Sequence, residues 1–206
     1  MTSPLSPLSI AQKLRLATHQ AHEALDRRIM ASAPFSSRER YTQFLRAQHR
    51  FHLDIDPLFG NASLRTFVPD LAARRRLDEI QRDLDDLGVR TEPGDLQGDL
   101  QLAAPSGAWG WLYVAEGSKL GAAILLKHAE TLGLSDTFGA RHLAAHHDGR
   151  ARHWRSFTGA LDRLPWTEAE EAAMADAARQ AFARMLGYVE QSMPLSPAPA
   201  AGLKVG

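Results

Sequence analysis

Residues 113–130 read YVAEGSKLGAAILLKHAE, and this stretch decides which fold the sequence predicts. No proline interrupts it, and its apolar residues recur at helical spacing, which predicts a helix. These apolar residues are Val114, Leu120, Leu125 and Leu126. Gly117 and Gly121 lie inside the predicted helix, although each glycine costs about 1 kcal/mol relative to alanine. The two glycines therefore indicate that something approaches the backbone of this helix closely.

The two glycines belong to a strip of small residues on one face of the predicted helix. They are four residues apart, so they lie one turn apart on the same side. Ser118 and Ala122 widen the strip, and Gly110 extends it upstream. Such a strip permits the close approach of another helix or of a flat ligand. The membrane form of this helix contact is excluded, because Glu116 and Lys119 are charged.

The composition restricts the class of protein. The chain has 206 residues, which suits one domain with one core, and it carries 24 basic and 24 acidic residues. This balance of charge argues against a general nucleic-acid binder, which would normally be basic. The absence of cysteine excludes disulfides, zinc ribbons, iron–sulfur ligation and thiol catalysis. With no secretory signal and no run of roughly 20 apolar residues, we expect a soluble, cytoplasmic protein with no membrane contact.

Helical periodicity recurs along the chain without an alternating strand pattern, which predicts an all-α fold. Ser9 with Gln12, and Thr167 with Glu170, are capping boxes that mark two helix starts. The predicted helices cover residues 10–29, 37–59, 69–88, 107–132, 150–164 and 167–193, with a short one between 133 and 149 and a polar connection from 89 to 106. We expect one bundle of about seven helices, residues 1–193, followed by a flexible tail, residues 194–206.

A histidine near the N-terminus is a candidate ligand. His22 shares a helix face with Arg15, Thr18, His19 and Asp26. Seven residues are nearly two turns, so Arg15 lies almost in line with His22, about 10 Å along the axis. This geometry suits a flat ligand such as haem, whose iron takes imidazole and whose propionates pair with arginine. A polar surface position or an inter-helix contact is the alternative explanation for His22.

Three segments together resemble a known family. ATHQAHEALD near the N-terminus, GWLYVAEGSKLGAAILLKHAE in the middle and GARHLAAHHDGRARHWRSF further on look like a bacterial haem oxygenase, most closely the haem-iron-acquisition type of Gram-negative bacteria. The resemblance covers residues 14–188, and its middle segment is the most specific. It implies a single-domain helical bundle in which haem is sandwiched between a proximal and a distal helix.

The resemblance also implies roles for individual residues. His22 matches the proximal ligand of the haem iron, and Arg15 matches a basic residue near a propionate. The distal helix over the haem is matched by Gly117, Ser118, Gly121 and Ala122, the last being an alanine shared with the bacterial subgroup that reads EGSNLGAA. Lys119 replaces the asparagine of that subgroup. Tyr113 and Phe182 match positions that line the haem pocket.

The function implied is the oxidative cleavage of haem to biliverdin, ferrous iron and CO, with haem as both substrate and cofactor and with O2. Electrons would come from a separate ferredoxin or flavin reductase, because nothing in the sequence resembles a flavin or nicotinamide site. The stretch ARRRLDE, residues 73–79, is expected to be a solvated face that could also dock an acidic donor, and Arg27 and Arg28 are further candidates. The alternatives are a non-catalytic haem carrier or sensor with this fold, and a helical protein that binds another small molecule. The histidines of residues 142–153 match no zinc spacing.

Overall fold

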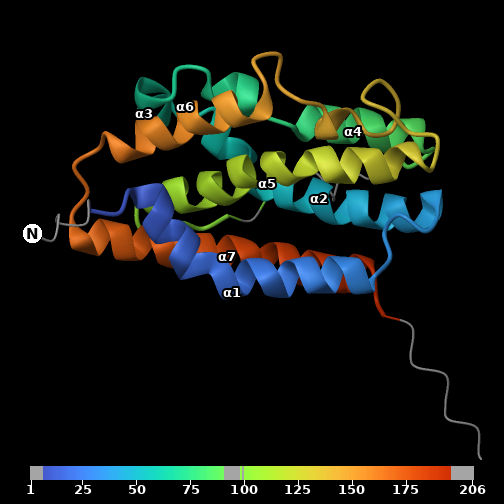
Figure 1. Ribbon diagram of the computed structural model, residues 1–206, viewed down its shortest axis with the longest axis horizontal. Helices are drawn as coiled ribbons and strands as arrows, with labels where there is room; N and C mark the ends of the chain where they lie inside the picture. The colour runs from blue at the N-terminus through green and yellow to red at the C-terminus, as the bar shows by residue number, and fades with distance from the viewer. Residues whose placement is uncertain (1–6, 91–97, 99, 196–206) are drawn as a thin grey trace, which may run out of the picture.

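The computed structural model describes residues 7–90, 98 and 100–195, and within them every long element is an α-helix (Figure 1). The all-α prediction is therefore confirmed. The helices are α1 (Ile10–Ala31), α2 (Arg38–Phe59), α3 (Ala62–Phe67), α4 (Leu77–Asp86), α5 (Gly107–Glu130), α6 (Arg150–Asp162) and α7 (Glu168–Ser192), with short 3-10 helices η1 (Leu71–Arg74) and η3 (Arg141–Leu143). The predicted tail lies almost wholly outside the described residues, so the domain boundary at residue 193 stays a prediction.

Both predicted capping boxes are present. The Ser9 hydroxyl accepts a hydrogen bond from the backbone N–H of Gln12, whose side chain accepts one from the backbone N–H of Ser9. Thr167 and Glu170 make the same reciprocal pair at the start of α7. Each box provides partners for backbone groups that a helix terminus would otherwise leave without one. The starts of the two helices that form the lowest layer of the bundle were thus readable from local sequence.

The prediction of one helix over residues 69–88 was wrong. The structure places η1 and α4 there, separated by Arg75 and Arg76, and the backbone of Arg75 is extended at φ −57° and ψ 142°. The interruption lets the side chain of Arg74 turn inward, where it is fully buried. The sequence analysis also missed α3, a helix of six residues capped by Asn61. Within the predicted polar connection before α5, residues 91–97 and 99 lie outside the described residues.

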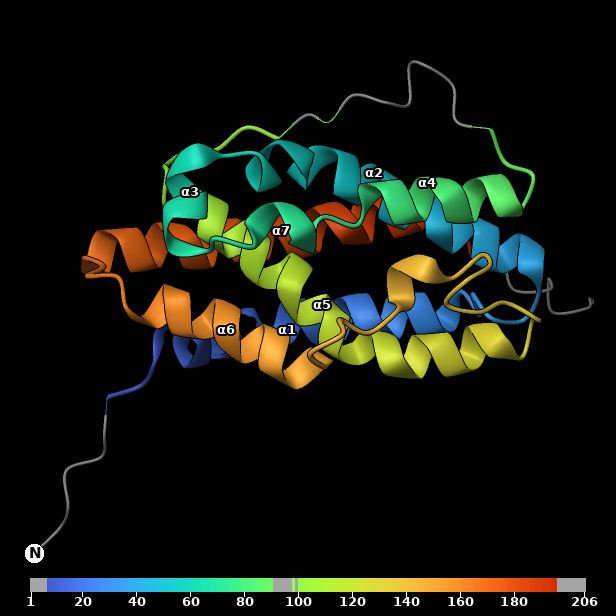
Figure 2. The ribbon, with the colours of Figure 1, turned by 90° about the horizontal axis from the view of Figure 1, so that it is seen from above.

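The helices form layers that can be followed in Figure 1, with α1 and α7 lowest, α5 and α2 above them, and α6 and α4 uppermost. Helix α7 is central, because α1, α2 and α5 all pack on it. In contrast, α1 and α5 make little direct contact with each other, although both pack on α6 and α7. Figure 2 shows the same arrangement from above. The described part of the chain contains no helix long and apolar enough to span a membrane.

Helices α1 and α7 run parallel and are joined at three levels. Lys13 Nζ lies 2.7 Å from a carboxylate oxygen of Glu171 near the start of both helices. Arg179 donates to the carbonyl of Ala17 at 3.3 Å. At the far end, Arg28 donates to the carbonyl of Met193 at 2.6 Å. His22 lies between the second and third of these ties.

Candidate functional site

Helix α5 changes environment halfway along its length. Every residue from Gly107 to Glu116 is buried, whereas most residues from Gly117 to His128 are exposed or half-buried. In the buried half, a Cβ on Gly110 would lie 2.2 Å from the carbonyl oxygen of Met174 in α7. Close helix packing therefore explains Gly110, which the sequence analysis had placed in the same strip as the later glycines.

The two glycines of the exposed half have a different environment. A Cβ on Gly117 would meet the ring of Trp154 at 3.7 Å, an ordinary contact, and a Cβ on Gly121 would meet no described atom within 4 Å. Leu120 and Ile124 beside them are 41% and 64% exposed. Close packing against protein therefore does not account for Gly121. We name the side of α5 that carries Gly117, Leu120, Gly121 and Ile124 the open face of α5.

His22 is an accessible imidazole on the neighbouring helix. Its side chain is 58% exposed, and Nδ1 lies 3.2 Å from a carboxylate oxygen of Asp26. Its ring meets Phe182 of α7 edge-on, with the centroids 5.6 Å apart. A carboxylate that accepts from Nδ1–H leaves Nε2 as the free acceptor, the tautomer required of a metal ligand. His19 instead pairs with Glu23 at 3.4 Å on the exposed surface, so the two histidines are distinguishable.

Arg15 and Tyr113 lie close enough to interact electrostatically across the space between α1 and α5. Burial raises the pKa of the Tyr113 hydroxyl, and the positive charge of Arg15 partly offsets that rise. The Tyr113 ring also packs at 5.4 Å from the ring of Trp154. Because Tyr113, Gly117 and Gly121 follow one another at intervals of four residues, they share one face of α5. The structure therefore brings Arg15 of α1 near Tyr113 of α5, and His22 of α1 against Phe182 of α7.

The side chains of the other predicted positions on α5 are directed to protein atoms or are buried. The Ser118 hydroxyl donates to the carbonyl of Ala115 at 2.8 Å. Lys119 is directed to the carbonyl of Arg74 at 2.7 Å and to the carboxylate of Glu116. The ammonium group of Lys119 is thus directed toward Arg74 and Glu116. Lys119 stands where the bacterial subgroup has asparagine. Ala122 is buried in a second core cluster, so its part in the site stays a prediction.

Sequence reasoning missed a buried ionic network where the two halves of α5 meet. Glu116 is 2% exposed, and its carboxylate lies 2.8 Å from the guanidinium of the fully buried Arg74. His153 lies 3.8 Å from Glu116 and 3.6 Å from Asp70. Burial, with the nearby charge of Arg74, lowers the pKa of His153 to about 4. In the sequence, Glu116 stands as a single carboxylate at the end of an apolar run, and this isolated charge could have indicated the network.

The histidine-rich segment before α6 holds a group of possible metal ligands. His146, His147 and Asp148 bring one ligand atom each within 4.8 Å of one another. The His146 ring stacks on His153 with the centroids 4.1 Å apart, and it lies 4.0 Å from the ring of His147. Ring packing is therefore a sufficient explanation of this cluster.

Comparisons with known proteins identify the family to which the chain belongs. The haem oxygenase family model matches residues 8–191, so this chain belongs to the haem oxygenase family. It is thus an oxidoreductase of the class that degrades haem. The resemblance seen in the three sequence segments is confirmed.

Individual relatives agree with this assignment. Heme oxygenase PigA of Pseudomonas aeruginosa is 42% identical over 185 residues, which are 88% of this chain and 92% of that protein. The structure of the NO- and CO-bound haem oxygenase of Neisseria meningitidis superposes with a TM-score of 0.84 and 38% identity, covering 95% of this chain and 99% of that one. Haem oxygenase 2 of Chlamydomonas reinhardtii, solved without haem, has a TM-score of 0.75 at 15% identity, with coverage of 93% and 100%, and shows the shared fold alone.

Proposed function

We propose that the protein binds haem between α1 and α5 and cleaves it to biliverdin, ferrous iron and CO, as its family indicates. The observation that carries the proposal is the pairing of an accessible imidazole, His22, with an open helix face at Gly121. The two helices share neighbours without packing closely on each other, so a flat ligand between them displaces no close helix contact. The residues present fit haem on these grounds.

The side chains on α1 hold and orient the substrate. His22 supplies Nε2 to the iron while Asp26 fixes the tautomer and raises the basicity of the ring. Phe182 packs edge-on against the imidazole and limits its rotation. Arg15, exposed on the same helix face, supplies a guanidinium for a propionate at the edge of the ring.

The open face of α5 leaves room above the ring and provides backbone rather than bulky side chains there. Haem, when bound, supplies the iron that activates O2. Gly117 and Gly121 leave space for a small ligand and for ordered water, which orients groups by hydrogen bonds. The Ser118 hydroxyl is directed to a helix carbonyl, so the polar groups presented at this position are those of the backbone. We infer that the electrons come from a separate donor protein.

A haem carrier or sensor is the second candidate function. Storage requires an axial ligand but not an unfilled face on the opposite helix. The empty surroundings of a Cβ at Gly121 therefore favour the oxygenase.

The test is an absorption titration with one equivalent of haemin, followed by reductant in air with catalase present. We expect a Soret band that decays as a biliverdin band grows. His22→Ala should remove the Soret shift, and His19→Ala, the matched control on the same helix, should retain both the shift and the turnover. A stable Soret band that depends on His22 would indicate a carrier. A Soret band unchanged by His22→Ala would overturn the assignment of the ligand.

A further inference from the structure

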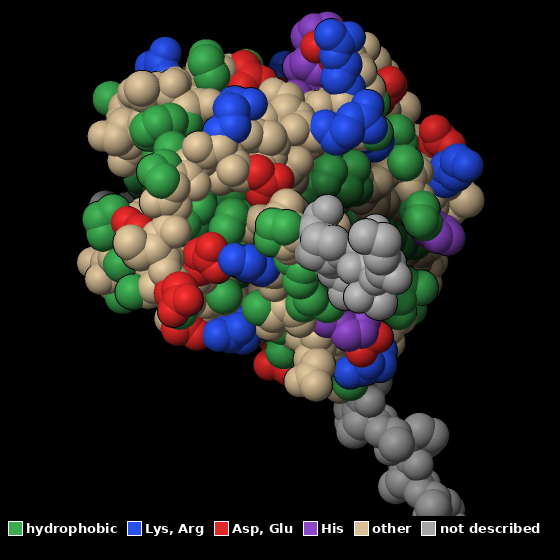
Figure 3. Space-filling model, turned by 60° about the vertical axis from the view of Figure 1, so that its left-hand side comes forward, with side chains coloured by type: hydrophobic (Ala, Val, Ile, Leu, Met, Phe, Trp, Pro, Cys, Tyr) green, Lys and Arg blue, Asp and Glu red, His purple; other side chains and the backbone are tan. Residues whose placement is uncertain are grey.

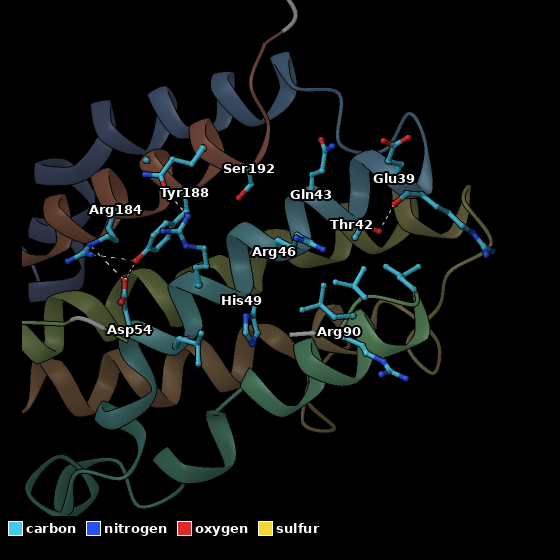
Figure 4. A pocket seen from close by; sticks show the side chains of 18 of the residues that line it. Glu39, Thr42, Gln43, Arg46, His49, Asp54, Arg90, Arg184, Tyr188 and Ser192 are labelled. Carbon is cyan, nitrogen blue, oxygen red and sulfur yellow. Dashed lines mark hydrogen bonds and ion pairs between the residues drawn. The ribbon is translucent and has the colours of Figure 1, made fainter. Parts of the chain in front are cut away.

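A large groove lies between α2, α4 and α7, away from the residues assigned to haem. Its volume is about 1290 Å³, and Figure 4 shows side chains from the three elements converging on it. None of the residues proposed above to hold haem lines it. Small-molecule pockets usually measure about 300–1,000 Å³, so this groove is large for a small ligand.

The groove is locally basic in a protein with no net charge. Its lining includes five arginines, namely Arg38, Arg46, Arg50, Arg90 and Arg184, against the three acids Glu39, Asp54 and Asp86. Elsewhere, as on the face in Figure 3, acidic and basic side chains are interspersed. A cleft lined mainly by one sign of charge concentrates its field and attracts partners of opposite sign.

Two of the three acids are engaged within the protein, and the partner of Asp86, Arg141, lies outside the groove, so that the groove arginines remain in excess. Asp54 is buried and accepts a hydrogen bond from the Tyr188 hydroxyl at 2.6 Å. Asp86 pairs with Arg141 and accepts from the backbone of Gly139 at 2.7 Å. Arg46 and Arg90, both exposed, have no ion pair within the described ranges.

Two further arginines are held in fixed positions around Tyr188. The guanidinium of Arg50 lies 4.2 Å above the centre of the Tyr188 ring and donates to Gln191 at 2.7 Å. Arg184 Nη1 lies 3.5 Å from the Tyr188 hydroxyl, and its Nε lies 3.8 Å from Asp54. Ordering these side chains before binding lowers the entropy that an incoming partner must remove.

The groove and His22 lie on opposite sides of α7. Phe182 contacts His22, and at roughly 100° per residue Arg184 and Gln191 lie roughly 180–200° around the helix from Phe182. Both Arg184 and Gln191 line the groove. A helix with its side chains is about 10–12 Å across. A partner seated in the groove is therefore separated from the proximal histidine by a single helix.

We propose that this groove docks an acidic segment of the electron-donor protein, a one-electron carrier of the [2Fe–2S] ferredoxin class. The inference rests on the proposed function. Carboxylates of the donor pair with the lining residues Arg46 and Arg90, while Arg50 and Arg184 lie at Tyr188. In each encounter the reduced iron–sulfur centre loses one electron and the ferric haem iron gains it, becoming ferrous. The docking surface is thus behind α7 rather than over α1.

The test compares two double charge reversals. Arg46→Glu/Arg90→Glu alters the groove, and Arg65→Glu/Arg152→Glu, at exposed positions outside it, gives the same change in net charge. A reduced plant-type ferredoxin serves as donor under CO, so that the ferrous–CO Soret band reports electron arrival. Calorimetry of ferredoxin with the haem-free protein gives a second readout that needs no turnover. Dithionite, which requires no docking, reports whether haem binding and reducibility are intact.

At low ionic strength we expect the groove variant to slow reduction by ferredoxin at least about tenfold and to weaken binding, with dithionite reduction unchanged. The neutral variant Arg46→Gln/Arg90→Gln should lie between it and the unaltered protein. Equal slowing by the control variant would overturn the proposal, as would slowing by Arg27→Glu alone, which would place docking over α1. Failure of ferredoxin to bind or reduce the unaltered protein would also overturn it. Absence of haem degradation with every reductant would instead remove the proposed function, and the docking inference with it.

Discussion

The two halves of α5 contain the same residue type for opposite reasons. In the buried half, Gly110 allows the backbone of α7 to approach so closely that a Cβ would lie 2.2 Å from the carbonyl oxygen of Met174. In the exposed half, Gly121 faces space that no described atom occupies within 4 Å. One glycine contributes to folding, and the other leaves room for a ligand while lowering helix stability. A strip of small residues in a sequence therefore combines two functions that only the tertiary environment separates.

The largest expected effect concerns the network where the two halves meet. Glu116→Ala should lower the free energy of unfolding by about 3–5 kcal/mol, because it leaves the charge of Arg74 buried without its main partner. Urea denaturation measures this, with Glu130→Ala on the exposed half as a control that should change stability by less than about 0.5 kcal/mol. A loss under about 1 kcal/mol would mean that Asp70, 2.9 Å from Arg74, suffices as partner.

The same network makes stability depend on pH. The pKa of His153 is lowered to about 4 by burial and by Arg74, so the folded state favours the neutral ring. Its contribution is complete above the unfolded pKa of about 6.5 and is lost as pH falls from there toward 4, by up to about 3 kcal/mol. His153→Gln should flatten the profile of unfolding free energy between pH 6.5 and 4. An unchanged slope in that variant would show that other groups cause the acid sensitivity.

In the buried half, Gly110→Ala should destabilise the protein by about 1–3 kcal/mol, because the added methyl group meets backbone atoms of α7 that cannot rotate away. Thermal unfolding followed by circular dichroism measures the change. If the melting temperature stayed constant, α5 and α7 would have to separate without cost, and the contrast between the two halves would weaken.

The smallest effect has the opposite sign. Gly121→Ala should stabilise the haem-free protein by about 1 kcal/mol, since the methyl group improves helix propensity and meets no described atom. For a chain of this size the melting temperature should rise by about 2–4 °C. A fall would reveal a close neighbour of Gly121. This single pair of alanine substitutions, at residues 110 and 121, therefore tests the comparison directly.

The elements with strong local signals were predictable. The capping boxes at Ser9 and Thr167 depend on residues three positions apart, so the sequence contains all the information for them. The helix predicted over residues 69–88 failed because its interruption is tertiary. Arg74 leaves the helical path to reach Glu116, which lies 42 residues away in the chain. No local pattern identifies such a partner.

The candidate site also has features that the sequence predicts and features that depend on tertiary contacts. His22 and Gly121 were proposed from residue type, spacing and family likeness, and the structure leaves His22 exposed and no described atom near a Cβ at Gly121, while their roles stay predictions. Gly110 was assigned to the same strip because spacing alone does not reveal what lies opposite a helix face. The basic groove drew no attention, because its arginines come from α2, α7 and the segment after α4, which only the fold brings together.

The three ties between α1 and α7 hold the first helix near both of its ends. Lys13 and Arg28 join it to α7 near its two termini, and Arg179 adds a support at Ala17. A helix held in this way resists sliding along α7, and between Ala17 and Arg28 side-chain packing, such as that of His22 on Phe182, holds it instead. We therefore expect the register of α1 on α7, and with it the contact of His22 with Phe182, to be preserved when a ligand enters between α1 and α5.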